Sequence, residues 1–473
     1  MKKLLLNSYI FIFSFFLVFN SVSFGQWMSS LGSAGQIWAI AVNQSSSQII
    51  YAGSNTTGIW KTNDGGFNWS QSNSGLTNLT VQAIAISRSD PNVLFAGTSQ
   101  TGTGAGIYKS TDAGANWIQV NSGIVETSLG IQSIAIDHTN PNVAYVAVFD
   151  GLVDSPQGLY KTTNGGTNWN IANSGIGTIK NFLTIAINPM NTNVVYCGSS
   201  FGVTSQMGPS KIYKSIDAGS TWNDISTGLP SLTTDVKPVR CISISTLDTA
   251  VLLAGLFLNT DSLGGMFVST NGGQQWIRRH NGIPNLVNTL IRSCLIRPGS
   301  STEFYAGLGN ATNSGIGVYR STNAGVSWIE FNSGVMNNTI SVRALNYSSL
   351  TGRILAGAAH PTVTTGQGLF YYEFPSGIGN QNSSLPEAFK LNQNYPNPFN
   401  PVTTLSYSIP SVQHTMLKVY DVNGKLVSTL VNEIQSAGEY KITFNGNGLS
   451  SGVYFYELVS GNFTDTKTMM IIK

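Results

Sequence analysis

The sequence predicts an all-β protein in two parts, and three observations support this prediction. A phrase of 15 residues, KTNDGGFNWSQSNSG at 61–75, returns five more times before residue 335. Short apolar runs separated by turn residues surround each copy, and they lack the spacing of an amphipathic helix. Near residue 375 the repetition ends and the composition changes, which indicates a second module.

The repeated unit is predicted to be the blade of a β-propeller. Its tryptophan recurs at intervals of 48 to 54 residues, as Trp69, Trp117, Trp169, Trp222, Trp276 and Trp328. Within 81–123 the runs VQAIAIS, VLFAGT, GIYKST and ANWIQVN give four short strands. A four-stranded unit of about 50 residues, rich in glycine and aromatic residues, is typical of a propeller blade.

The phrase itself is predicted to be the turn between the third and fourth strands. Asp or Asn caps this turn, Gly two residues later adopts positive φ, and Trp packs between blades. The six sets are Asp64, Gly66 and Trp69; Asp112, Gly114 and Trp117; Asn164, Gly166 and Trp169; Asp217, Gly219 and Trp222; Asn271, Gly273 and Trp276; and Asn323, Gly325 and Trp328. The pattern resembles the Asp-box repeat of sialidases, sortilin-type receptors and related propellers, which implies a structural role. A calcium loop is the alternative, but three copies carry Asn and further acidic ligands are missing.

The repeat count predicts seven blades. Residues 341–374 supply three strands, SVRALNY, RILAGAA and GLFYYEF, and no fourth strand follows them. The missing strand is expected at the other end of the chain, because GQWMSSLGSAG at 25–35 aligns with NWSQSNSGLTN and places Trp27 at the tryptophan position. Closure by this N-terminal strand removes two exposed sheet edges. We therefore predict a seven-bladed propeller over residues 26–375.

A linker at 376–388 precedes a small immunoglobulin-like β-sandwich predicted over 389–473. Its runs alternate apolar and polar residues, and Asn-Gly at 423–424 predicts a hairpin turn. The module resembles the type A C-terminal sorting domain of the type IX secretion system, through YPNPF at 395–399, VYDVNGK at 419–425 and GVY at 452–454. The resemblance implies the type IX secretion machinery as a partner and passage across the outer membrane. A sandwich with an unrelated adhesive role is the alternative.

The first 25 residues are interpreted as a secretory signal peptide. MKK precedes an apolar run from Leu4 to Phe19, and Ser23 and Gly25 fit the small residues of a cleavage site. Cleavage would leave Gln26 at the N-terminus. An uncleaved membrane anchor is the alternative, and no other segment is apolar enough to span a membrane. The expected location is therefore secreted, or on the outer cell surface of a bacterium.

Composition argues against several function classes. Charged residues make up 10% of the chain, below the roughly 25% of a typical soluble domain, and the formal net charge is +3. Nothing in this composition indicates a nucleic-acid partner. The four histidines are scattered over unrelated elements, so neither a metal site nor a cofactor is expected. Cys197, Cys241 and Cys294 are interpreted as small buried hydrophobic residues, with one disulfide as the alternative.

A candidate ligand site comes from aligning the starts of the innermost strands. The aligned residues are Trp38, Gln82, Gln132, Leu183, Arg240, Arg292 and Arg343. Equivalent positions on a ring converge, so the three arginines and Trp38 are predicted to line the mouth of the central channel. Guanidinium groups suit a carboxylate, sulfate or phosphate, such as one on an acidic glycan or peptide. The alternative is that each arginine binds loop carbonyls between blades.

A glycoside hydrolase is the competing function. Asp150, Asp154, Asp235 and Asp261 are expected in loops of the channel face, and two carboxylates about 5 to 10 Å apart can hydrolyse a glycoside. Xyloglucan-cleaving hydrolases have similar blades but build their cleft from two propellers, whereas this sequence has one. Sialidases bind a carboxylate with three arginines, but their Tyr and Glu pair does not map onto this chain. The favoured prediction is a non-enzymatic binding protein.

Overall fold

The computed structural model describes most of the chain from residue 26 onward. The described residues are 26–32, 34–99, 105–124, 130–149, 158–177, 181–200, 211–230, 238–257, 264–284, 289–310, 315–334, 340–349, 351–359, 368–374, 388–410, 413–435, 438–461 and 463–472. Among them, no helix is long and apolar enough to cross a membrane.

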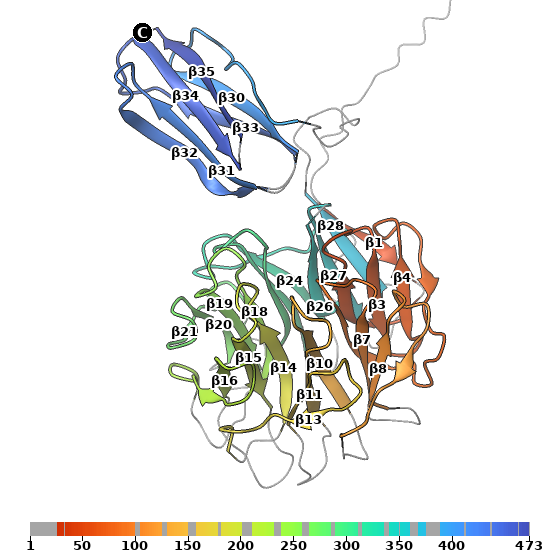
Figure 1. The fold of residues 1–473 in the computed structure, drawn as a ribbon. Helices are drawn as coiled ribbons and strands as arrows, with labels where there is room; N and C mark the ends of the chain where they lie inside the picture. Colours follow the sequence, from red (N-terminus) through yellow and green to blue (C-terminus); the bar gives the residue numbers. More distant parts are fainter. Residues whose placement is uncertain are drawn as a thin grey trace, which may run out of the picture.

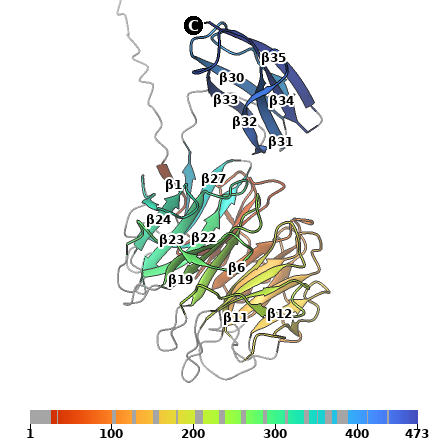
Figure 2. The same ribbon diagram turned by 90° about the vertical axis from the view of Figure 1, so that its left-hand side faces the viewer.

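The described part of residues 26–373 forms seven four-stranded antiparallel sheets, which Figure 1 and Figure 2 show in two views turned by 90°. Six sheets follow chain order. They are β2 (Ile37–Val42), β3 (Ile50–Ser54), β4 (Ile59–Thr62) and β5 (Ser70–Gln71); β6 (Val81–Ile86), β7 (Leu94–Thr98), β8 (Ile107–Ser110) and β9 (Ile118–Gln119); β10 (Gly130–Ile136), β11 (Ala144–Phe149), β12 (Leu159–Thr162) and β13 (Asn170–Ile171); β14 (Phe182–Ile187), β15 (Val195–Ser199), β16 (Ile212–Ser215) and β17 (Asn223–Asp224); β18 (Val239–Ile244), β19 (Leu252–Leu256), β20 (Gly265–Ser269) and β21 (Ile277–Arg278); and β22 (Thr289–Ile296), β23 (Phe304–Asn310), β24 (Gly315–Ser321) and β25 (Ile329–Glu330). The all-β class predicted from the sequence is confirmed.

The seventh sheet combines strands from distant parts of the chain. Its order is β1 (Gln26–Leu31), β28 (Gly368–Glu373), β27 (Arg353–Ala359) and β26 (Ser341–Ser348). The strand β1 runs antiparallel to β28, with Trp27 opposite Tyr372. Contacts also join β26 to β2, as they join each first strand to the next, so the first strands form a closed ring at the centre. We number the blades one to seven from the sheet of β2 to the sheet of β26.

Six turns between third and fourth strands, here called box turns, share one set of hydrogen bonds. In the second blade, Ser110 Oγ donates to Asp112 Oδ1 at 2.7 Å, and the backbone N–H groups of Gly114 and Asn116 donate to Ser110 Oγ and Asp112 Oδ1 at 2.9 Å each. The asparagine turns are built alike, since Asn323 Oδ1 accepts from Ser321 Oγ at 2.9 Å. Each carboxyl or amide oxygen therefore caps its own turn.

The tryptophan after each box turn joins its blade to the preceding blade. Trp117 donates through its backbone N–H to Ser74 at 2.9 Å and through Nε1 to the carbonyl of Ser72 at 2.8 Å. A Cβ atom on Gly75 would overlap with the carbonyl oxygen of Trp117, which explains the glycine that ends the repeated phrase. Equivalent backbone and Nε1 bonds are made by Trp169, Trp222, Trp276, Trp328 and, from β1, Trp27.

The described part of residues 388–472 forms a second body of two antiparallel sheets. One sheet contains β29 (Lys390–Leu391), β30 (Val402–Ile409) and β33 (Gly438–Asn445), and the other contains β32 (Leu426–Gln435), β31 (Gln413–Tyr420), β34 (Gly452–Ser460) and β35 (Phe463–Ile471). Buried residues of both sheets, including Leu405, Leu417 and Tyr456, share one core. This arrangement is a β-sandwich.

Candidate functional site

Each innermost strand of the propeller contains a break in register at the same position. The residue passed over in each strand is Trp38, Gln82, Gln132, Leu183, Arg240, Arg292 or Arg343. Such β-bulges re-aim a side chain, and seven of them at equivalent positions direct seven side chains alike. We call these seven residues the bulge ring. They are the residues that sequence alignment had placed together.

Two contacts join neighbouring members of the bulge ring. Gln132 Nε2 donates to Gln82 Oε1 at 3.0 Å between the third and second blades. The guanidinium carbon of Arg343 lies 4.4 Å from the centre of the Trp38 ring, between the seventh and first blades. A cation in this position over an indole face is attracted by the ring electrons. Both contacts span adjacent blades, as expected for side chains that face a common centre.

The three arginines of the bulge ring converge. Burial lowers the pKa of Arg292, and the positive charges of Arg343 and Arg240 lower it further. The pKa of Arg343 is lowered by burial and by Arg240, although these two residues come from blades that are not adjacent. An influence of one charge on the pKa of another requires that the three guanidinium groups lie within electrostatic reach of one another.

Burial makes this cluster of like charges unusual. The Nε atoms of all three arginines are buried, and Nε of Arg240 has no hydrogen-bond partner among the described residues. Burial lowers the pKa of Arg240 as well. A guanidinium group nevertheless stays charged at neutral pH, so the cluster presents concentrated positive charge at the centre of the ring. An anion with several oxygen acceptors is the ligand that this arrangement can stabilise.

The four candidate catalytic acids, Asp150, Asp154, Asp235 and Asp261, lie outside the described residues. The described residues contain no group of three or more His, Cys, Asp and Glu side chains that could hold a metal ion. Cys197 and Cys241 are buried and Cys294 is partly buried, and all three are free thiols.

The box turns lie at the opposite end of the blades from the bulge ring. Each bulge lies near the beginning of a first strand, which pairs with the end of the second strand. Each box turn follows the end of a third strand, which pairs with the beginning of the second strand. The bulge and the box turn of a blade therefore lie at opposite ends of its second strand. Asp64, Asp112 and Asp217 accept hydrogen bonds from their own turns, which lower the pKa of each carboxyl group. The carboxylate oxygens of these three residues therefore accept hydrogen bonds within their own turns and have a structural role.

Sequence reasoning missed an ion-pair cluster in the sixth blade. Glu303, which precedes β23, accepts from Arg297 Nε and from Arg320 Nη2, both at 2.6 Å. The detectable signal was in the third strands, because Arg320 stands where Lys61, Lys109, Lys161 and Lys214 stand in the first four blades.

In the sandwich, the segment at 395–399 is held between both sheets. Phe399 is buried, and its backbone N–H donates to Met470 at 2.9 Å while its carbonyl accepts from Ile472 at 3.0 Å. Asn394 Nδ2 donates to the carbonyl of Pro396 at 3.0 Å and to Thr403 Oγ1 at 2.9 Å. The aromatic and polar residues around this motif therefore serve to fix its path along the sandwich.

Comparison with known proteins identifies the C-terminal module and the propeller class. Residues 393–473 match the secretion system C-terminal sorting domain. No curated protein sequence matches the chain. Among solved structures, the chain resembles a GH74 enzyme of Niastella koreensis, with 15% identity and a TM-score of 0.51, covering 95% of this chain and 68% of that enzyme.

A second similar structure is PorZ of Porphyromonas gingivalis, described as an essential bacterial surface component of the type IX secretion system. It shows 14% identity and a TM-score of 0.51, covering 93% of this chain and 60% of PorZ. At such identities these similarities support the β-propeller fold and leave activity open. The sorting domain shows that the protein is exported through the type IX secretion machinery, to the cell surface or beyond it.

Proposed function

We propose that this protein is an exported, non-enzymatic binding protein whose propeller holds an anionic group at the bulge ring. The observation that carries this proposal is the convergence of Arg240, Arg292 and Arg343 from three blades. Bringing three guanidinium groups together costs desolvation and repulsion, and a bound anion would offset both.

The ligand we favour is an acidic glycan that carries a carboxylate or sulfate. The arginines would bind the charged group, while Gln82 and Gln132 offer amide groups that both donate and accept hydrogen bonds to hydroxyls. Trp38, already stacked on Arg343, adds an aromatic surface beside the charge. An acidic peptide is the second ligand that the same cluster would accept.

The test measures binding of oligogalacturonate and of oligoglutamate to the full chain by calorimetry. We expect oligogalacturonate to bind, and to bind more weakly as salt rises, because charge interactions are screened over about 8 to 10 Å near physiological ionic strength. Replacing Arg240, Arg292 or Arg343 by Gln should each cost about 1 to 3 kcal/mol of binding free energy. Lys467→Gln is the control, since Lys467 pairs with Asp465 at 3.8 Å in the sandwich and should leave binding unchanged.

Two results would contradict the proposal. If the arginine variants lose thermal stability but bind oligogalacturonate as the parent does, the cluster has a structural role only. Release of reducing sugars that is abolished by Asp154→Ala or Asp261→Ala would instead show a glycoside hydrolase. Tighter binding of oligoglutamate than of oligogalacturonate would keep the site and change the ligand class.

A further inference from the structure

A cation links neighbouring blades at the end of the propeller where the box turns lie. In six cases a Lys or Arg side chain donates to a backbone carbonyl within the box turn of the next blade. These pairs are Lys61 with Ala113 at 2.9 Å, Lys109 with Gly165 at 2.8 Å, Lys161 with Ala218 at 2.7 Å, Lys214 with Gly272 at 3.0 Å, Arg279 with Ala324 at 2.6 Å, and Arg353 with Gly65 at 3.4 Å. We call each of these bonds an interblade clasp.

The junction between the sixth and seventh blades has a different arrangement, because the seventh blade takes its fourth strand from β1 instead of continuing through a box turn. Arg320 occupies the clasp position on β24 but donates through Nε and Nη2 to Glu303 Oε1, at 3.0 and 2.6 Å. Tyr305 also donates to this oxygen, at 2.6 Å. Glu303 thus supplies within the sixth blade the acceptor that a box turn supplies elsewhere.

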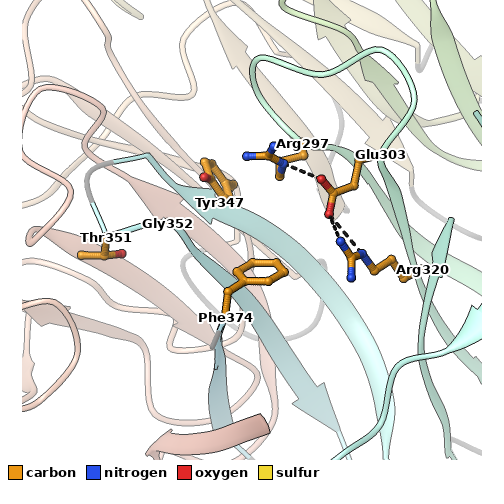
Figure 3. Close-up of a pocket in the computed structure, with 7 residues that line it drawn as sticks. All are labelled: Arg297, Glu303, Arg320, Tyr347, Thr351, Gly352 and Phe374. Carbon is orange, nitrogen blue, oxygen red and sulfur yellow. Dashed lines mark hydrogen bonds and ion pairs between the residues drawn. The ribbon is translucent and has the colours of Figure 1, made fainter. Parts of the chain in front are cut away.

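The place that a box turn fills at other junctions is here a pocket of about 510 Å³. Its lining is Arg297, Glu303, Arg320, Tyr347, Thr351, Gly352 and Phe374, which Figure 3 shows as sticks around the opening. Arg297, Glu303 and Arg320 come from the sixth blade, and the other four residues come from the seventh. This volume is in the range of small-molecule sites, about 300 to 1,000 Å³.

The polar groups of this pocket are held in fixed positions. The guanidinium of Arg320 lies 5.5 Å from the ring centres of Phe331 and Phe374 and 5.9 Å from that of Tyr305. Glu303 stays ionised, because hydrogen bonds from Tyr305 and the charges of the two arginines lower its pKa against the opposing effect of burial. A ligand would therefore meet donors and an acceptor that are already oriented, which reduces the entropy lost on binding.

The ionic groups of the pocket favour one class of ligand. Two guanidinium groups and one carboxylate form an ion-pair network with a small net charge, so the lining presents hydrogen-bond donors beside an acceptor. Vicinal hydroxyl groups satisfy both, because each hydroxyl donates one hydrogen bond and accepts others. We propose that this pocket binds one neutral pyranose ring of a saccharide, with its hydroxyls toward Arg297 and Glu303 and its apolar face against Phe374. This site goes beyond the proposed function, since it lies at the other end of the blades and needs no anion.

The test measures saturation-transfer NMR and calorimetric affinity on the full chain with methyl β-glucoside, methyl β-galactoside and methyl α-mannoside. We expect at least one of these glycosides to bind. For that glycoside, Phe374→Leu and Arg297→Gln should each weaken affinity about threefold to tenfold, the effect of one lost ring contact or hydrogen bond. Thr351→Val, in an exposed turn, should weaken it less, because Thr351 Oγ1 already donates to Ser348 Oγ at 2.5 Å.

Arg343→Gln in the bulge ring separates this inference from the proposed function, and it should leave glycoside affinity unchanged. If none of the three glycosides binds, the inference is wrong. It is also wrong if affinity falls in Arg343→Gln but not in Phe374→Leu and Arg297→Gln, because the sugar would then occupy the bulge ring. Weakening confined to the pocket variants would support the saccharide site whether or not oligogalacturonate binds elsewhere.

Discussion

The junction between the sixth and seventh blades and the junction between the first and second differ in what crosses them. At the first, a single box turn brings both the clasp acceptor, Ala113, and the interblade tryptophan, Trp117. At the later junction, Trp27 arrives from the N-terminal strand and donates to Phe331 and Ser333, while Glu303 replaces the acceptor. The two tasks of a box turn can therefore be supplied by separate parts of the chain, and the described residues line a pocket of about 510 Å³ between them.

Loss of the closing strand β1 is expected to change the stability of the propeller most. Deleting residues 26–31 would remove Trp27 and leave β28 and the sixth blade without their partner. We expect the free energy of unfolding to fall by more than about 5 kcal/mol, beyond the 3 to 5 kcal/mol typical of one buried aromatic side chain. Urea denaturation followed by tryptophan fluorescence measures this change. A truncated protein with the parent's unfolding midpoint would show that β1 does not close the ring.

A finer comparison sets the two interblade tryptophans against each other. Trp27 and Trp117 are 1% and 2% exposed, and both donate Nε1 to a carbonyl of the preceding blade. Trp27→Ala and Trp117→Ala should thus destabilise alike, by about 3 to 5 kcal/mol each. Trp69 is only partly buried and donates instead to Ser30 and Gly66, so Trp69→Ala should cost less. If Trp27→Ala destabilised the protein much less than Trp117→Ala, the closing strand would contribute less to the stability of the ring than a box turn does.

The sequence was sufficient to predict the blades because each task of the box turn requires a particular residue. Asp or Asn must cap the turn, and tryptophan must reach the preceding blade, so the same letters recur and Trp27 could be aligned with them. The bulge ring was also predictable as a set, because first strands of similar length place equivalent residues alike. The bulges themselves could not be predicted from the sequence. These strands pack on both faces, so their apolar pattern does not indicate where the pairing register shifts by one residue.

The pocket beside Phe374 could not be predicted for a different reason. Glu303 is one acidic residue in a turn, and only the fold brings it to Arg297 and Arg320 from two other elements. Glu303 acts as the acceptor because the sequence after β28 does not contain the box-turn phrase. The lack of a phrase gives no motif from which a pocket could be predicted. The sequence signal that remained was Arg320, which stands where the first four blades have Lys.

The smallest expected effect concerns the two versions of the box turn, with Asp or with Asn. Asp112 Oδ2 accepts from Asn116 Nδ2 at 2.9 Å, whereas Asn323 Nδ2 donates to Ser327 Oγ at 2.8 Å, so in these two turns the residue four positions later suits the capping residue. Asp112→Asn would place two amide donors together and lose one exposed hydrogen bond. We expect a slight destabilisation at neutral pH, of about 1 °C or less in melting temperature.

This small effect has a characteristic pH dependence. Hydrogen bonds from Asn116 and Ser110 lower the pKa of Asp112 to about 2 in the folded protein, below the ordinary value of 3.8 that applies when it is unfolded. The ionised carboxylate therefore stabilises the fold above about pH 4, and this contribution is lost as the pH falls toward 2. The difference in unfolding midpoint between the parent and Asp112→Asn should shrink over that interval in urea titrations. A difference that stays constant from pH 7 to pH 2 would mean that the charge of Asp112 contributes nothing to stability.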